Sequence, residues 1–224
     1  TTGSYSFTAQ LSDASSPAQV KSVALSIRVA TPLVINTPSG SLPDAVQGIG
    51  YSYNLLSSGG IAPTAWGVSA GQLPPGISLS APGALTGAPT ATGTYSFTAQ
   101  LLDASKPAQL KSVVLSIRVA LPLVITTPPG ALPNAMAKVV YSYTLASSGG
   151  NAPITWSLTA GSLPEGLTLS SSGKISGTPN CTGTFTFTVQ ASDASSPQQV
   201  KTATFCIKVT CYDPDHDGDC EDRD

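Results

Sequence analysis

The sequence predicts an all-β protein built from tandem β-sandwiches of seven strands each, and three observations predict this class. Nearly identical segments start at residues 1, 91 and 181, so a unit of 90 residues recurs along the chain. That length suits a small domain and exceeds a solenoid repeat. Within the unit, apolar and polar residues alternate with a period of two, as in strands that bury one face. Clusters of Gly, Pro, Ser and Asp separate these runs, as turns do.

The repeat also divides the chain. TTGSYSFTAQLSDASSPAQVKSVALSIRVA at 1–30 matches ATGTYSFTAQLLDASKPAQLKSVVLSIRVA at 91–120 and CTGTFTFTVQASDASSPQQVKTATFCIKVT at 181–210. We therefore expect these segments: the last two strands of an incomplete repeat at 1–30, complete repeats at 31–120 and 121–210, and an acidic segment at 211–224. Because the chain begins within the pattern, it resembles part of a longer secreted precursor.

The strands of the last repeat can be placed in order. Alternation is clearest in TFTFTVQA at 184–191 and KTATFCIKV at 201–209, where β-branched residues dominate. Between the runs stand SSGG, LPEG, SSSG and DASSP. We expect strands near 121–127, 138–147, 153–160, 167–170, 173–177, 184–192 and 200–210. Seven short strands in one such unit are typical of an immunoglobulin-like β-sandwich.

Each complete repeat has one tryptophan, Trp66 or Trp156, in the expected third strand. A core aromatic is the usual role for such a residue, and a platform that stacks on a sugar is the alternative.

The segment LPEGLTLSSSGKISGTPNCTGTFTFTVQASDASSP at 163–197 resembles the signature of the He_PIG-type immunoglobulin repeats of bacterial surface proteins, which are related to cadherin-like domains. The likeness covers both complete repeats. Repeat 31–120 departs from it at Leu85, which replaces the usual isoleucine, and at Ala88 before Pro89. The resemblance implies an immunoglobulin-like or cadherin-like fold, and a role in extracellular stalks, in adhesins or as a spacer in large polymer-degrading enzymes.

Charge composition excludes several classes of function. Only 10% of the residues are charged, compared with about 25% in an ordinary soluble domain. Residues 1–210 carry nine basic and five acidic side chains, whereas 211–224 carry one basic and seven acidic side chains. The neutral, hydroxyl-rich repeats cannot neutralise a row of phosphates, which argues against nucleic-acid binding. No apolar stretch approaches the ~20 residues that a membrane-spanning helix needs.

The acidic segment has the spacing of a calcium-binding loop. Counting from Asp213 as position 1, acids fall at positions 1, 3, 5, 9 and 12, and Gly218 occupies position 6. Oxygen ligands at alternate positions, a sharp turn at Gly and a closing acid are the pattern of an EF-hand loop. The loop resembles those of thrombospondin type 3 repeats and dockerins, and a solvated acidic tail is the alternative. The expected Ca²⁺ site comprises Asp213, Asp215, Asp217, Asp219 (through its backbone carbonyl), Glu221 and Asp224.

All four cysteines lie in the last repeat and the acidic segment. An even number without a CxxC motif favours two disulfides and hence an oxidising, extracellular compartment. We expect the pairs Cys181–Cys211 and Cys206–Cys220, while the other two connectivities and a bridge from Cys206 to another chain stay open.

No catalytic set can be assembled from the residues, so we do not expect an enzyme. The chain has a single histidine, and the repeats contain too few acids for a hydrolase carboxylate pair. Asp13, Asp103 and Asp193 recur in the DASxP loops, where an aspartate most often caps its own backbone turn.

The expected function is an extracellular structural or adhesive segment, a semi-rigid stalk or filament at the bacterial cell surface. The junction between the repeats has no flexible Gly/Ser linker, which favours stiffness. Two strands alone are not stable, so residues 1–30 need a partner in a longer chain or in another copy. The alternatives are a carbohydrate- or receptor-binding module and a spacer within a large secreted enzyme.

Overall fold

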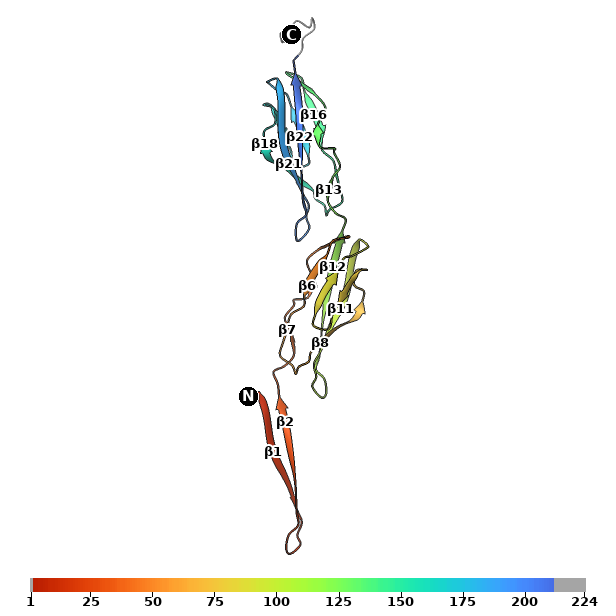
Figure 1. Ribbon diagram of the computed structural model, residues 1–224, viewed down its shortest axis with the longest axis vertical. Coiled ribbons are helices and arrows are strands. Elements are labelled where there is room, and N and C mark those ends of the chain that lie inside the picture. Colours follow the sequence, from red (N-terminus) through yellow and green to blue (C-terminus); the bar gives the residue numbers. More distant parts are fainter. Residues whose placement is uncertain (1, 212–224) are drawn as a thin grey trace. The chain divides into compact units, whose positions relative to one another are not determined.

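The structure is a computed structural model, and it describes residues 2–211 (Figure 1). Strands and turns make up these residues, which form an N-terminal hairpin and two β-sandwiches. The hairpin joins β1 (Gly3–Ser12) to β2 (Val20–Val29), and the two strands pair antiparallel over their full length. The all-β class and the tandem sandwiches are confirmed.

The first sandwich contains a three-stranded sheet of order β6-β10-β9 and a larger sheet of order β4-β12-β11-β8, in which β5 also pairs with β12. A further short pair joins β3 to β7. The strands are β3 (Val34–Ile35), β4 (Gly40–Ser41), β5 (Ala45–Val46), β6 (Tyr51–Asn54), β7 (Ser57–Ser58), β8 (Ala65–Gly71), β9 (Ile77–Leu79), β10 (Ala84–Gly87), β11 (Gly93–Leu102) and β12 (Leu110–Ala120).

The second sandwich repeats this arrangement strand for strand. Its sheets have the orders β16-β20-β19 and β14-β22-β21-β18, β15 pairs with β22, and β13 pairs with β17. The strands are β13 (Val124–Ile125), β14 (Gly130–Ala131), β15 (Ala135–Met136), β16 (Tyr141–Thr144), β17 (Ser147–Ser148), β18 (Thr155–Gly161), β19 (Leu167–Leu169), β20 (Lys174–Gly177), β21 (Gly183–Ser192) and β22 (Val200–Thr210).

The core of the second sandwich is built from alternate residues of β21 and β22, as the pattern predicts. Phe187, Val189, Phe205 and Ile207 are fully buried, and the ring centroids of Phe187 and Phe205 lie 6.2 Å apart. Burying such a side chain contributes about 1.5–3 kcal/mol. Core packing, rather than any ligand, therefore accounts for the apolar half of each strand.

The start of the repeat differs from the expectation. The predicted strand 121–127 contains only two strand residues, and β14 and β15 are two-residue strands that the pattern does not predict. Pro128 and Pro129 lack an N–H group and cannot continue a ladder. β13 pairs with β17, whereas β14 pairs in parallel with β22, on the larger sheet.

The contacts within the chain define two compact units whose boundaries do not follow the sequence repeat. The first unit consists of 1–42, 50–88 and 94–117. The second consists of Pro43–Ile49, Pro89–Gly93 and the chain from Arg118 onward. Asp44, which comes from repeat 31–120, therefore belongs to the same compact unit as the second sandwich.

Candidate functional site

The carboxylate of Asp193 organises the loop between β21 and β22. Its Oδ1 accepts hydrogen bonds from the backbone N–H groups of Ser195 (3.1 Å) and Gln199 (2.8 Å). Its Oδ2 accepts from Ser195 Oγ (2.6 Å), Gln199 Nε2 (2.9 Å) and the Asn151 N–H (2.9 Å). These five donors saturate the roughly four lone-pair sites of a carboxylate. Asp193 therefore has the predicted capping role in its own loop.

Asp103 makes the same contacts in the first sandwich. It accepts hydrogen bonds from Ser105, from the backbone and side chain of Gln109, and from the Ile61 N–H at 2.9 Å. Asp13, in the exposed hairpin, accepts only from its own loop. The loop is thus a repeated capping motif, to which the complete sandwiches add two donors, a backbone N–H from another loop and the side-chain amide of the glutamine.

Hydrogen bonds lower the pKa of all three aspartates. For Asp103 and Asp193, burial by itself raises the pKa, but the serine hydroxyl and the backbone N–H groups outweigh it. For Asp13, the hydroxyl of Ser15 is the main cause of the lowered pKa. Each carboxylate is thus held charged by donors that favour its ionised form.

The capping loops also hold the strand that begins each sandwich. The N–H of Leu123 donates to the side-chain oxygen of Gln199 at 2.9 Å, and Gln199 in turn donates to Asp193. In the first sandwich, the N–H of Leu33 donates to Gln109 at 3.0 Å. Each Asp–Gln pair therefore fixes the residue that immediately precedes the short strand β13 or β3.

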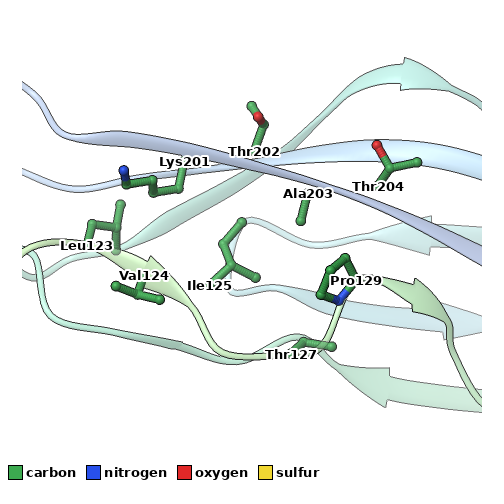
Figure 2. A pocket seen from close by; sticks show the side chains of 9 residues that line it. All are labelled: Leu123, Val124, Ile125, Thr127, Pro129, Lys201, Thr202, Ala203 and Thr204. Atoms are coloured by element: carbon green, nitrogen blue, oxygen red, sulfur yellow. The ribbon is translucent and has the colours of Figure 1, made fainter.

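An open groove lies between β13 and β22 of the second sandwich, with a volume of about 610 Å³ (Figure 2). Ile125 and Ala203 point toward each other across it, and Thr202 points away from β13. The lining residues are Leu123, Val124, Ile125, Thr127, Pro129, Lys201, Thr202, Ala203 and Thr204.

One side of this groove is a strand edge. β21 pairs with β22 from Ser192↔Val200 to Gly183↔Val209. On the other side of β22, the described residues provide partners only at Phe205–Cys206 and Val209–Thr210. The edge of 200–204 therefore has no ladder partner among residues 2–211.

The strand register shows which backbone groups of β22 point toward the open edge. The N–H of Leu132 donates to the carbonyl of Cys206, and the N–H of Ala137 donates to that of Thr210. Alternate residues of a strand direct their backbone groups to the same side. The N–H and C=O groups of Thr202 and Thr204 therefore face the groove.

The groove recurs in the first sandwich at the same position of the repeat. An open pocket of about 350 Å³ is lined there by Pro32, Leu33, Val34, Ile35, Lys111 and Ser112. Lys111 corresponds to Lys201 at the offset of 90 residues. The strand pattern alone does not predict this groove, although the proline that follows the PLVI segment in both repeats, Pro38 or Pro128, is a signal for it.

The hairpin β1–β2 exposes the residues that its copies bury. Phe7 is 47% exposed, whereas Phe97 at the equivalent position is 2% exposed. Ile27 is 55% exposed and Ile117 is fully buried. Among the described residues, β1 and β2 pair only with each other. The hairpin therefore presents an apolar face and two strand edges.

A polar network in the second compact unit joins residues of the two complete repeats. Arg118 forms a bidentate ion pair with Asp44, with N–O distances of 3.1 and 2.8 Å. The second carboxylate oxygen of Asp44 also accepts from the N–H of Ser196 at 3.0 Å. The Asn151 amide contacts Ser195 Oγ at 2.8 Å beside this pair. The network is not predictable from local sequence patterns because its members are far apart in the chain.

Both tryptophans are core residues. Trp66 and Trp156 are 7% and 6% exposed, and a Cβ at Gly173 would lie 2.8 Å from the indole Nε1 of Trp156. The backbone at Gly173 packs against the indole of Trp156, and little of either tryptophan is exposed for a sugar to stack on. The burial of both side chains fits their expected role as core aromatics and argues against the alternative of a sugar-stacking platform at Trp66 and Trp156.

The predicted disulfides Cys181–Cys211 and Cys206–Cys220 are not formed in the structure, because Cys181 and Cys206 are thiols. Cys211 is in a disulfide. Cys206 occupies β22 between the fully buried Phe205 and Ile207. The ladder partners of Cys206 on its two sides are Thr186 and Ala131, so no cysteine stands opposite it.

The predicted calcium loop at 213–224 lies outside the described residues. Within residues 2–211, no three His, Cys, Asp or Glu side chains gather closely enough to hold a metal ion. That part of the chain also has no helix long and apolar enough to cross a membrane.

The fold and its repeated capping loops define a class, the immunoglobulin-like β-sandwich repeats. The family model He_PIG, described as "Putative Ig domain", matches residues 31–120 and 122–210. The chain belongs to this family. No curated protein matches it.

Solved structures with the same architecture include Drosophila OTK extracellular domains 3–5, with 13% identity, a TM-score of 0.57, and coverage of 93% of this chain and 71% of that one. The titin I-band fragment I67–I69 has 15% identity, a TM-score of 0.48, and coverage of 80% and 66%. The protocadherin gamma B4 extracellular domain has 16% identity and a TM-score of 0.37. The match covers 92% of this chain but only 39% of that protocadherin chain. At 13% identity, the likeness to the OTK domains concerns the fold alone.

Proposed function

We propose that this chain is an extracellular structural or adhesive segment, which serves as a semi-rigid stalk or filament at the bacterial cell surface. The contact of Asp44 with Ser196 carries the proposal, because it joins residues of consecutive repeats. Asp44 is also held by Arg118. A charge-assisted hydrogen bond is about twice as strong as a neutral one. Such a network restrains a junction that has no flexible linker.

The side chains within the sandwiches support a non-catalytic role. The buried carboxylates of Asp103 and Asp193 are saturated by donors of their own sandwiches, and both tryptophans are in the cores. A carbohydrate-binding role therefore lacks an aromatic platform at Trp66 and Trp156.

NMR relaxation of the full chain tests the stiffness. We expect the two repeats to tumble with one correlation time, and Asp44→Ala to separate their correlation times because Ser196 and Arg118 lose their shared acceptor. Asp13→Ala, in the exposed hairpin loop, is the control and should change nothing. Independent tumbling of the two repeats in the unmodified chain would contradict the stalk.

Calcium is the second part of the proposal. Binding at 213–224 would stabilise only the ordered form of this segment and so stiffen the chain beyond the second sandwich. Titration calorimetry with CaCl₂ on the full chain should show one site, which Asp217→Asn weakens at least about tenfold because a charged ligand is lost. Asp222→Asn removes an acid at a position the pattern does not use, and it should bind Ca²⁺ like the unmodified chain. Equal losses in the two variants would favour a non-specific acidic tail.

Assembly is the third part. The exposed apolar face of β1–β2 suits strand complementation with a neighbouring repeat or another copy. Burial of Phe97 and Ile117 at the equivalent positions supports this, because the same sequence is covered when its sandwich is complete.

A further inference from the structure

The ion pair between Asp44 and Arg118 presents a complete guanidinium edge to the second sandwich. Nε and Nη2 of Arg118 donate to the two oxygens of Asp44 at 3.1 and 2.8 Å. Both residues belong to the same compact unit as the second sandwich. The Asp44 side chain is 11% exposed and that of Arg118 is 47% exposed. The carboxylate is therefore largely covered, while the guanidinium stays partly open to solvent.

Asn151 approaches the same edge of the guanidinium from the second sandwich. Because a guanidinium has only donors, the Asn151 amide presents its oxygen to Arg118. This oxygen lies 3.0 Å from Nη2 and 3.3 Å from Nε. The backbone of Asn151 is fixed in turn, since its N–H donates to Asp193 at 2.9 Å.

The backbone of Ser196 contacts the other member of the pair. Its N–H donates to Oδ2 of Asp44 at 3.0 Å, and its carbonyl accepts from the N–H of Asp44. Ser196 belongs to the DASxP loop that Asp193 caps. The second repeat therefore offers an acceptor to the guanidinium and a donor to the carboxylate, and the same aspartate holds both in place.

The two complete repeats differ at the positions of the ion pair. At the offset of 90 residues, Asn134 takes the place of Asp44, and Lys208 takes the place of Arg118. A lysine is a point charge and lacks the planar edge that binds two acceptors at once. An asparagine has no charge and a single side-chain oxygen. Repeat 121–210 therefore cannot present the same pair to whatever adjoins it.

The order of the segments along the chain agrees with this difference. The repeat that carries Asp44 and Arg118 is followed by another repeat, 121–210. The repeat that carries Asn134 and Lys208 is followed by the acidic segment 211–224, which does not continue the repeat pattern.

We propose that Asn151 and the backbone of Ser196 form a recognition surface for a preceding repeat that ends in an Asp–Arg pair, and that this surface rejects an Asn–Lys pair. The surface selects arginine at position 118 because only a guanidinium can bind Asp44 and Asn151 along one edge. This inference rests on the stalk proposed above and names the residues that decide which repeats form a stiff junction.

NMR relaxation of the full chain tests the selection with substitutions taken from the chain itself. Arg118→Lys introduces the residue of position 208, and Asn151→Ile introduces the residue that the first sandwich has at position 61. Because the other repeat contains each replacement, both variants should stay folded, which tryptophan fluorescence checks. We expect each variant to separate the correlation times of the two repeats. The double variant should separate them no further, since both changes remove one shared contact.

Arg28→Lys is the matched control, because it makes the same change at the equivalent position of the exposed hairpin. It should leave the common correlation time unchanged. Two repeats that tumble independently in the unmodified chain would overturn both the stalk and this inference. Common tumbling that persists in Arg118→Lys and Asn151→Ile would overturn the recognition surface and leave the stalk standing.

Hydrogen exchange tests the contact in the unmodified chain. The amides of Asp44 and Ser196 should be protected, and in Arg118→Lys they should exchange about tenfold faster because the carboxylate loses its partner. Amides of the core strand β21 should exchange equally in both chains. Fast exchange at Asp44 and Ser196 in the unmodified chain would overturn the contact on which the recognition depends.

Discussion

Gln199 binds both oxygens of the Asp193 carboxylate, with its backbone N–H 2.8 Å from Oδ1 and its side-chain amide 2.9 Å from Oδ2. The oxygen of the same side-chain amide accepts a hydrogen bond from the N–H of Leu123. One aspartate therefore closes the β21–β22 loop and, through Gln199, holds the start of β13 at the end of the groove.

Replacing Asp193 with alanine should destabilise the second sandwich by about 2–4 kcal/mol, because several donors lose their acceptor in a site that is 2% exposed. Equilibrium denaturation in a Trp66→Phe background measures this, since Trp156 then reports on the second sandwich alone.

Asp13→Ala is the matched control for that variant. It changes the same DASxP motif in the exposed hairpin, so the stability of the second sandwich should stay within about 0.5 kcal/mol. A similar loss in both variants would mean that the effect does not come from the buried contacts of Asp193.

Acid should destabilise both sandwiches. The pKa values of Asp103 and Asp193 are lowered on folding, so below the unfolded pKa of about 3.9 the unfolded chain binds protons that the folded chain does not. Their contribution is complete at neutral pH and is lost as the pH falls through the folded pKa values. Midpoints of denaturation should be nearly constant from pH 7 to about 5 and then decline.

Asp193→Asn provides the comparison for the acid dependence. The variant should be less stable at neutral pH, and its second sandwich should lose less stability on acidification because one titrating group is gone. An unchanged slope below pH 4 would show that other carboxylates cause the decline.

Gly177→Ala should cost about 3 kcal/mol or more in the stability of the second sandwich. Gly177 has a φ of 141°, and an added Cβ would overlap the carbonyl oxygen of Gly166, the residue before the neighbouring strand β19. Both the backbone strain and the overlap are unfavourable.

Gly67→Ala serves as the control, because a Cβ there meets no atom within 4 Å. We expect a change within about 0.5 kcal/mol in the first sandwich, measured by the fluorescence of Trp66 in a Trp156→Phe background. A large loss at Gly67 would indicate that the strands do not tolerate alanine generally.

The thiols can be mapped directly. Alkylation of the folded, unreduced chain and then peptide mass spectrometry should label Cys181 and Cys206, which are thiols, and should not label Cys211. A disulfide-linked peptide that contains both Cys181 and Cys211 would instead favour the pairing expected from the sequence.

Local patterns made much of the fold predictable. Alternation in β21 and β22 identifies Phe187 and Ile207 as core, because a strand has only two faces and one of them is buried. The DASxP motif identifies Asp193 as a cap, because the donors of Ser195 and Gln199 are within six residues of it.

Features that depend on distant contacts were not predictable. The alternation of residues along β22 places Cys206 on the outer face of the strand. It does not show which other cysteine lies close enough to Cys206 to form a disulfide. The short strands β14 and β15 pair with a strand about 75 residues away, and nothing in their own two residues marks them as strands.

The sequence by itself determined the repeat, the all-β class, the buried face of the long strands and the capping aspartates, since each depends on residues close together in the chain. Only the tertiary structure decided that Asp44 meets Ser196, that both tryptophans are covered, and that the 200–204 edge of β22 lies open beside β13. These three depend on which segments pair across the sandwich. Strand pairing depends on contacts between segments that are far apart in the chain. The residues at the edge of β22 therefore do not determine it on their own.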